Sequence, residues 1–171
     1  DLHLCDNGSL NDIIWSLLLI SLKRWNNNIS TIFGIMGISI RDSINVGEMG
    51  NYSSGQIVKV ERIANDLSEQ VSYMTPILNK LKDRRAILSG VMVLNVVMKY
   101  IFNQFLFDKL GEQMNYISFI LTNVKGPTEQ LYLGSKYRVY DILPFVPHGN
   151  LPFSFLLFSY MGKLRFSIHG D

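Results

Sequence analysis

The residue types that most often perform acid–base or nucleophilic chemistry are few and scattered. The histidines are His3, His148 and His169, and the single cysteine is Cys5. His3 and Cys5 are two residues apart, which is not a spacing typical of a catalytic dyad, and for His148 a loop histidine bonded to backbone is the simpler interpretation. The sequence holds no zinc-type His or Cys spacing, no nucleophile elbow and no glycine-rich phosphate loop. We therefore expect no complete active site and no metal site within these residues.

Two short polar segments are better candidates for a functional site. Asn11-Asp12 opens a stretch that is otherwise apolar, and Thr122-Asn123 with Gly126-Pro127 ends another. Each segment has a purely structural alternative. The first would cap a helix and complement its N-terminal charge, an effect of about 0.5–1 kcal/mol per residue. The second would be the exit turn of a strand.

The elements that position these segments follow from hydrophobic periodicity. Ser9 with Asp12 three residues later forms a capping-box pattern, which predicts a helix from about Ser9 to Trp25. The apolar, β-branched segment Ile32 to Ile40 predicts a buried strand. The glycine-containing segment Arg41 to Gly55 predicts a loop.

Two long helices are expected next. Apolar residues recur at steps of three and four between Val60 and Leu81, which predicts an amphipathic helix over about Gln56 to Leu81 that Pro76 kinks or splits. A second helix is expected after Asp83 and should reach about Leu110.

The last third of the sequence predicts a sheet. The expected strands are Tyr116 to Thr122, Leu131 to Leu133, Tyr137 to Leu143, Phe153 to Tyr160 and Lys163 to His169. Met161-Gly162 between the last two predicts a hairpin. The order of elements lacks the regular alternation of a doubly wound sheet, so the expected fold class is α/β with a mixed sheet flanked by helices.

Composition restricts the class of protein. The chain has 171 residues, of which 47% are hydrophobic and 18% are charged, against about 25% charged in an average soluble domain. This bias predicts that much surface is hidden against a partner half, another copy or a membrane. A net charge of +2 argues against nucleic-acid binding, and one cysteine excludes a disulfide framework.

The two polar segments also carry a resemblance to a known family. Ser9 to Ile14 resembles the Thr-x-Asn-Asp-Val-Val segment of the wax ester synthase/diacylglycerol acyltransferase family. Thr122 to Pro127 resembles that family's Ser-Asn-Val-x-Gly-Pro turn. Further matches occur in the family's order at Phe33 to Ile40, Leu131 to Gly134, Ser159 to Leu164 and Asp171.

The resemblance implies a fold and a place within it. The family has the CoA-dependent acyltransferase fold, similar to chloramphenicol acetyltransferase, with two α/β lobes and a substrate tunnel between them. Its general base lies in a His-His-x-x-x-Asp-Gly motif of the N-terminal lobe. That motif is absent here, so residues 1–171 are expected to be a single C-terminal lobe, truncated at both ends, with no catalytic residue of its own.

The resemblance also assigns expected roles to the two polar segments. Asn11 and Asp12 would support the active site from the start of their helix. Thr122 and Asn123, with Gly126-Pro127, would line or shape the substrate tunnel.

The implied reaction moves a fatty acyl group from acyl-CoA to diacylglycerol or a long-chain alcohol. Acyl-CoA would be a co-substrate, with no bound cofactor, and the partners would be the N-terminal lobe, the lipid acceptor and a membrane surface. Apolar residues between Val91 and Phe107, beside Arg84, Arg85 and Lys99, would suit peripheral binding at the cytosolic face of the endoplasmic reticulum or plasma membrane, although they would equally suit a core.

Two other classes remain open. One is a non-catalytic lipid-binding or scaffolding remnant of the same fold, which the presence or absence of His-His-x-x-x-Asp-Gly upstream would distinguish. The other is a different enzyme of the fold, such as a peptide-forming condensation domain or an acetyltransferase, with a soluble acceptor.

Overall fold

A computed structural model describes residues 8–39, 53–83, 87, 116–134, 136–145 and 151–170. Its elements, in chain order, are α1 (Leu10–Trp25), β1 (Ile32–Ser39), β2 (Ser53–Val60), α2 (Leu67–Leu81), β3 (Phe119–Lys125), β4 (Tyr132–Leu133), β5 (Tyr137–Arg138), β6 (Phe153–Tyr160) and β7 (Lys163–Gly170). No helix in these ranges is long and apolar enough to cross a membrane.

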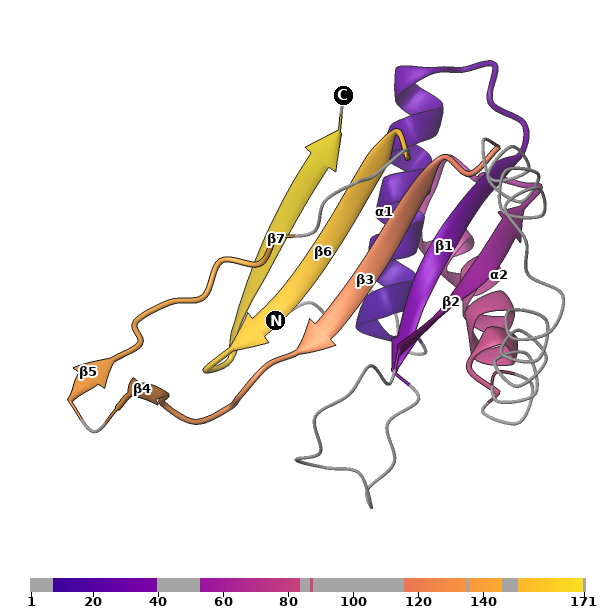
Figure 1. Ribbon diagram of the computed structural model, residues 1–171. Coiled ribbons are helices and arrows are strands. Elements are labelled where there is room, and N and C mark those ends of the chain that lie inside the picture. Colours follow the sequence, from indigo (N-terminus) through magenta and orange to yellow (C-terminus); the bar gives the residue numbers. More distant parts are fainter. Residues whose placement is uncertain are drawn as a thin grey trace, which may run out of the picture.

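A five-stranded mixed sheet organises the chain (Figure 1). Its strand order is β2-β1-β3-β6-β7, so strands from both halves of the sequence lie side by side. The three central strands are parallel, and each edge strand pairs antiparallel with its neighbour. Parallel strands need long crossovers, and this arrangement therefore brings the end of β3 close to elements far away in sequence.

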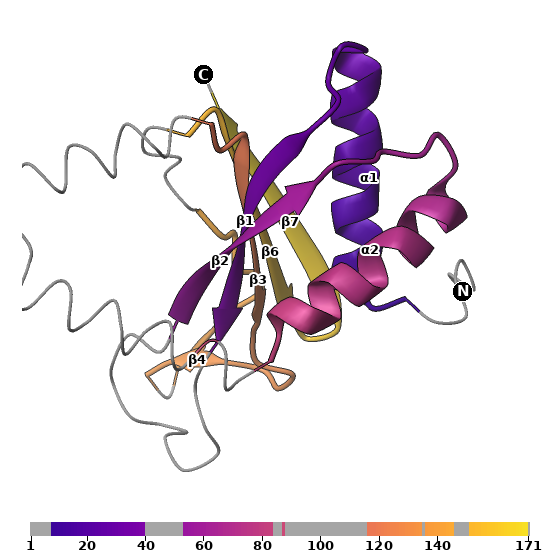
Figure 2. The ribbon, with the colours of Figure 1, turned by 90° about the vertical axis from the view of Figure 1, so that its right-hand side faces the viewer.

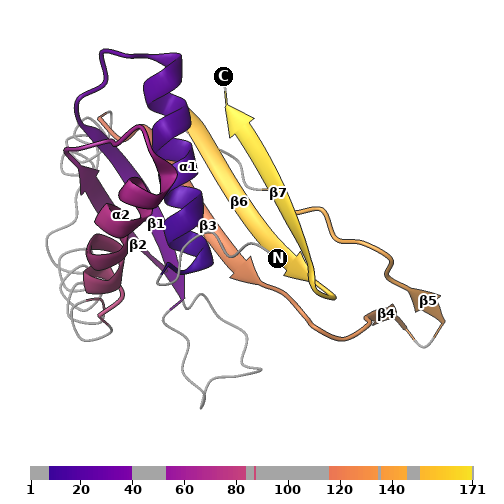
Figure 3. The ribbon, with the colours of Figure 1, turned by 180° about the vertical axis from the view of Figure 1, so that it is seen from behind.

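Both described helices pack on the same face of the sheet (Figure 2). Trp15 and Leu19 of α1, with Met74 and Leu78 of α2, are fully buried there against the inward side chains of the strands. Gly34 makes this packing possible, because a Cβ at that position would lie 2.7 Å from the indole ring of Trp15. Seen from behind, α1 lies over the centre of the sheet and α2 toward β1 and β2, whereas no described helix covers β7 (Figure 3).

The start of α1 agrees with the sequence prediction. The Ser9 backbone N–H donates to Asp12 Oδ2 at 2.7 Å, and the Asp12 N–H donates to Ser9 Oγ at 3.4 Å. This reciprocal pair is the expected capping box. Because both partners are within one turn, the local sequence determines where the helix begins.

The region before α2 corrects the prediction. Gln56 to Val60 is not helical; it belongs to strand β2, which starts at Ser53 and pairs antiparallel with β1. Val58 and Val60 are buried while Ile57 and Lys59 are exposed, so the side chains alternate with the period of a strand. Helix α2 begins only at Leu67 and continues unbroken past Pro76, so Pro76 does not split it.

The later strands largely match their prediction. Strand β3 runs through Asn123 to Lys125 rather than ending at Thr122, and β5 is shorter than the predicted Tyr137 to Leu143. The β6–β7 hairpin turns at Met161-Gly162, where both residues have positive φ. The second long helix predicted up to Leu110 lies outside the described residues, except for Ile87.

Residues 130–145, hereafter the arm, extend from the sheet and carry the small β4–β5 hairpin (Figure 1). Among the arm residues that the structure describes, large side chains are exposed at Leu131, Tyr132, Leu133, Tyr137, Tyr140, Leu143 and Phe145. Two contacts hold the end of the arm to β7. Arg165 pairs with Asp141 through its Nε and Nη2 atoms at 2.7–2.9 Å, and the ring of Phe145 meets that of His169 at 4.4 Å.

Candidate functional site

The two polar segments predicted from sequence meet in the structure. The Asn123 side-chain Nδ2 donates to Asn11 Oδ1 at 2.7 Å, a contact that spans 112 positions in the chain. Asn123 reaches α1 because it follows Phe119 and Leu121 on the face of β3 that points toward the helices. Asn11 lies in the first turn of α1, so the pair joins the start of this helix to the end of a central parallel strand.

The amide pair retains hydrogen-bonding capacity. A carboxamide has two N–H donors and an oxygen with two acceptor sites, and their mutual bond uses one donor and one acceptor position. Within the described part of the chain, neither side chain makes a further hydrogen bond. Both residues are partly exposed. The pair is therefore able to donate hydrogen bonds to a carbonyl oxygen of a bound molecule.

Asp12 lies directly beside this pair and is buried, with 1% of its surface exposed. Its Oδ2 accepts the Ser9 N–H and lies 3.4 Å from the hydroxyl oxygen of Thr75 in α2. The single proton of that hydroxyl is shared with the closer Val71 O, at 2.9 Å. Its Oδ1 has no hydrogen-bond partner, but the Lys82 ammonium lies 3.9 Å away. The carboxylate is thus approached from two elements, the start of α1 and α2 with its C-cap residue.

Thr122 does not join this group, because consecutive strand residues point to opposite faces. On the face away from the helices, Thr122 lies over Gly37 of β1, where a Cβ would come within 2.8 Å of Thr122 Oγ1. The structure therefore separates Thr122 from Asn123. Their predicted roles, if both hold, concern different sides of the sheet.

Gly126 and Pro127 fasten the end of β3 to the β6–β7 hairpin. The Gly126 N–H donates to Ser159 Oγ at 3.2 Å, and Pro127 O accepts the Met161 N–H at 3.0 Å. A Cβ at Gly126 would lie 2.1 Å from the Ser159 carbonyl oxygen. Only glycine fits this close approach, so this turn holds the strand end that carries Asn123.

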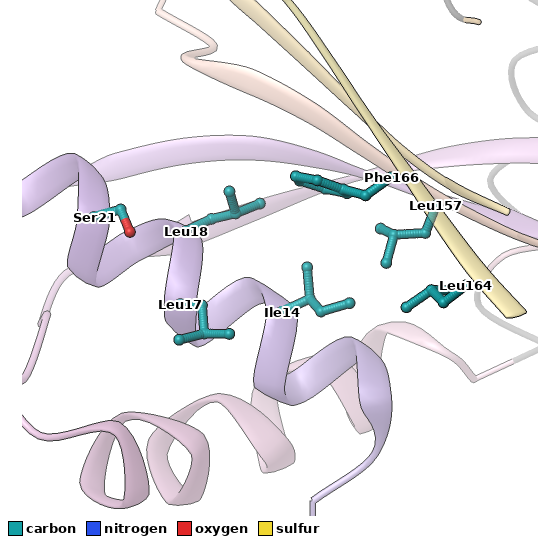
Figure 4. A pocket seen from close by; sticks show the side chains of 7 residues that line it. All are labelled: Ile14, Leu17, Leu18, Ser21, Leu157, Leu164 and Phe166. Atoms are coloured by element: carbon teal, nitrogen blue, oxygen red, sulfur yellow. The ribbon is translucent and has the colours of Figure 1, made fainter. Parts of the chain in front are cut away.

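An apolar pocket of about 260 Å³ lies between α1 and the β6–β7 hairpin (Figure 4), and two of its lining residues are neighbours of the amide pair in helix and sheet. Leu157 pairs with Asn123 in the β3–β6 register, and Ile14 lies one turn after Asn11. The complete lining is Ile14, Leu17, Leu18, Ser21, Leu157, Leu164 and Phe166. The volume is below the roughly 300–1,000 Å³ of typical small-molecule sites, so this pocket would hold only part of a long hydrocarbon chain.

The histidines do not assemble a site in the described residues. His169 Nε2 is buried without a hydrogen-bond partner, and its ring packs on Phe145 across the sheet from the amide pair. His3, Cys5 and His148 lie outside the described residues. Within those residues, no group of three or more His, Cys, Asp or Glu side chains could hold a metal ion.

Sequence reasoning missed two residues that approach Asp12, namely Thr75 within α2 and Lys82, its C-cap residue. Their spacing of seven places them on one face of a helix, and Thr75 is next to the buried Met74. This spacing indicates that both polar side chains face another element. It does not indicate which element that is.

Comparison with known proteins gives a family and a fold. The WS/DGAT C-terminal domain matches residues 49–171. The epimerization domain from the third module of tyrocidine synthetase B, TycB3(E), is similar with a TM-score of 0.57 and 16% identity, over 94% of this chain and 36% of that chain. The first condensation domain of the calcium-dependent antibiotic synthetase, in complex with substrate analogue 3a, has a TM-score of 0.46 and 12% identity, over 94% and 33%. No curated protein matches the chain.

These comparisons confirm the predicted fold class. The mixed α/β architecture is that of the CoA-dependent acyltransferase fold, which the epimerization domain shares. The chain spans about a third of the length of the solved structures it matches.

Proposed function

This chain belongs to the WS/DGAT C-terminal domain family, and we propose on that basis that it is the C-terminal lobe of an acyl-CoA-dependent O-acyltransferase. The acceptor is diacylglycerol or a long-chain alcohol, and the products are triacylglycerol or a wax ester with free CoA. The observation that carries the proposal is the match over residues 49–171, which includes β2, α2 and all later strands.

The reaction requires a base and a group that stabilises negative charge. The acceptor hydroxyl oxygen attacks the thioester carbonyl carbon while a base removes its proton, and the C–S bond then breaks as the CoA sulfur leaves and takes up a proton. Donors aimed at the carbonyl oxygen stabilise the charge that develops there. In the proposal, a histidine of the N-terminal lobe is the base, and this chain supplies positioning.

The amide pair of Asn11 and Asn123 is the group that would position the substrate. Its remaining N–H groups can bind a substrate carbonyl, and the neighbours Ile14 and Leu157 belong to a pocket lined mainly by aliphatic and aromatic side chains. A polar group adjoining an apolar pocket suits a fatty acyl thioester or ester. Asp12, next to Asn11 in the first turn of α1, would help to hold the amide pair in place, in line with the supporting role that the resemblance implies.

The proposal includes two partners that lie beyond the described residues. The first is an N-terminal lobe that carries the histidine motif. The second is the surface of a membrane, contacted through the region from Lys82 to Leu110.

Flotation of the full-length protein with liposomes, with and without charge reversal at Arg84, Arg85 and Lys99, tests the proposed membrane contact. Binding that survives both charge reversal and carbonate extraction would contradict a peripheral attachment.

A non-catalytic lipid-binding module is the competing function. It is favoured by one observation, namely that none of the three histidines lies in a His-His-x-x-x-Asp-Gly context. The coding sequence upstream of Asp1 distinguishes the two functions. A module without the motif would bind acyl-CoA or lipid and leave it unchanged.

The experiment that tests the proposal uses the full-length protein. Labelled palmitoyl-CoA is supplied with hexadecanol and, separately, with diacylglycerol, and the ester product is measured. We expect product with at least one acceptor, and loss of product when the second histidine of the upstream motif is replaced by alanine. We expect none from the 171 residues alone, because a positioned general base contributes about 10²–10⁴ in rate. Activity of these residues alone would contradict the assignment as a lobe without the base.

A further inference from the structure

Asp12 is unusual among the carboxylates that the structure describes because it is buried and contacted by a second helix. The side chain is 1% exposed. The cap to Ser9 is local to α1, but the Thr75 hydroxyl of α2 and the ammonium of Lys82, the C-cap residue of that helix, lie 3.4 and 3.9 Å away. Thr75 also has a closer acceptor within its own helix, Val71 O at 2.9 Å. Capping of α1 alone would need only Ser9.

Burial of a carboxylate is costly unless polar groups compensate for the lost water. The helix N-terminus compensates partly, through its N–H groups and positive end. Oδ1, however, is buried and makes no hydrogen bond. The nearest described compensation for Oδ1 is Lys82, whose side chain is 34% exposed and can keep part of its hydration.

The position of Asp12 is coupled to that of Asn11. The two residues share a peptide bond in the first turn of α1, so a shift of the Asp12 side chain and backbone moves Asn11 with it. Asn11 Oδ1 in turn accepts the amide of Asn123 at 2.7 Å. A chain of direct contacts therefore runs from α2 through Asp12 and Asn11 to the end of β3.

We propose that Thr75 and Lys82 are positioning residues of the acyltransferase site, which hold the Asp12 carboxylate and thereby fix the Asn11–Asn123 amide pair. The inference rests on the proposed function. It adds α2 to the site and assigns a role to two residues outside both polar segments. Neither residue touches substrate, and both act through Asp12.

A positioning role differs from a purely structural one in what it changes. Loss of a stabilising contact would lower the melting temperature and leave the turnover of the remaining folded protein intact. Loss of positioning lowers kcat at a temperature where the protein is fully folded, since a misplacement of about 1 Å can cost roughly a hundred-fold in rate. KM for acyl-CoA should change less than kcat.

The variants are Thr75→Val and Lys82→Met in the full-length protein, and each has a matched control on the same helix. Ser72→Ala removes a hydroxyl one turn earlier that donates to Ser68 O, and Lys80→Met removes an exposed lysine near the C-terminal end of α2. The conservative changes Thr75→Ser and Lys82→Arg keep a donor and a positive charge. Combining Lys82→Met with Asp12→Asn tests whether Lys82 acts through the carboxylate. The Asp12→Asn side chain keeps an oxygen that can accept the Ser9 N–H.

We expect kcat to fall about ten-fold in Thr75→Val and Lys82→Met, within the range that small misplacements produce. The two controls should keep wild-type kcat, and the conservative variants should recover most of it. In the Asp12→Asn background, Lys82→Met should add little further loss.

Two negative results have different meanings. Suppose that wild type transfers palmitate. If Thr75→Val and Lys82→Met then retain the wild-type kcat, or if Lys82→Met lowers kcat as much in the Asp12→Asn background as in wild type, the positioning role is wrong and the proposed function stands. If wild type makes no ester with either acceptor, the proposed function itself fails.

Discussion

The junction of Asn11, Asp12, Thr75 and Asn123 contrasts with the arm of residues 130–145. Each region contains one carboxylate that meets a basic side chain. Asp12 in the junction is 1% exposed and meets Lys82 at 3.9 Å. Asp141 in the arm is exposed, with 42% of its side-chain surface accessible, and meets Arg165 at 2.7 Å.

The ion pair with the shorter contact, Asp141–Arg165, is therefore the one that is exposed to water. A two-pronged Arg–carboxylate pair is strong in isolation, but an exposed ion pair contributes only about 0–1 kcal/mol because water and salt screen it. A buried carboxylate with longer contacts is harder to replace, since its partners cannot be exchanged for water. Burial, more than distance, should decide which region matters for stability and function.

The largest expected difference in stability between the regions comes from two glycines. Gly126→Ala places a Cβ 2.1 Å from the Ser159 carbonyl oxygen and should lower the free energy of unfolding by about 3 kcal/mol, the upper range for overpacking. Gly134→Ala in the arm meets no atom within 4 Å at φ +61° and should cost only about 1 kcal/mol of backbone strain. Urea unfolding measures both. Equal losses would mean that the end of β3 is not tightly held.

Replacement of the two aspartates gives a smaller difference in stability and a clear one in activity. Asp12→Ala leaves Ser9 as the N-cap of α1 but removes the Asp12 half of the capping box, the bond from the Ser9 N–H. This loss should cost about 1 kcal/mol in the free energy of unfolding, and the turnover of the folded full-length enzyme should fall by more than that loss of stability alone explains. Asp141→Ala should change stability little, because its ion pair is exposed to water and salt, and should leave turnover intact. Melting temperature and turnover are measured on the same preparations. A turnover loss in Asp141→Ala equal to that of Asp12→Ala would remove the distinction between the regions.

The smallest effect is a pH dependence confined to the arm. The hydrogen bond from Arg165 lowers the pKa of Asp141 below its usual value, and the N–H of Ile142 adds to this effect. A carboxyl with a lowered folded-state pKa stabilises the protein above its unfolded pKa of about 3.9 and loses that contribution as pH falls through the folded value.

The check is the difference in melting temperature between wild type and Asp141→Asn. This difference should be small and constant from pH 7 to 5, should shrink as the pH falls below about 4, and should decrease in 1 M salt at neutral pH. A difference that grows on acidification would have the wrong sign for a carboxylate stabilised by Arg165.

Local features of the junction and the sheet were predictable from sequence. The capping box of Ser9 and Asp12 acts within one turn, and the β6–β7 hairpin is set by the two residues between its strands. Their patterns are complete in a short window of sequence. Strand β2 was not predicted, because Val60 also fits the three-and-four spacing of the apolar residues in α2 and hides the alternation of Ile57 to Val60.

The contacts that bring the two polar segments together are long-range. The sequence therefore identified each segment as a candidate but did not predict that they meet. Asn11 and Asn123 were separate candidates, and only the pairing of β1 with β3 and the packing of α1 on the sheet place them 2.7 Å apart. Thr122 shows the reverse. It is adjacent to Asn123 in sequence, yet the pleat of β3 directs it to the other face.

The most direct test of the account is a double-mutant cycle of Asn11→Ala and Asn123→Ala in the full-length protein. Turnover with palmitoyl-CoA is measured well below the melting temperature of every variant. If the amide pair acts as a unit in the site, each single change lowers kcat about ten-fold or more, equivalent to ~1.4 kcal/mol, and the double variant is little worse than either. Wild-type turnover in both single variants, with only their melting temperatures lowered, would show that the contact is structural and contradict the assignment of a functional site here.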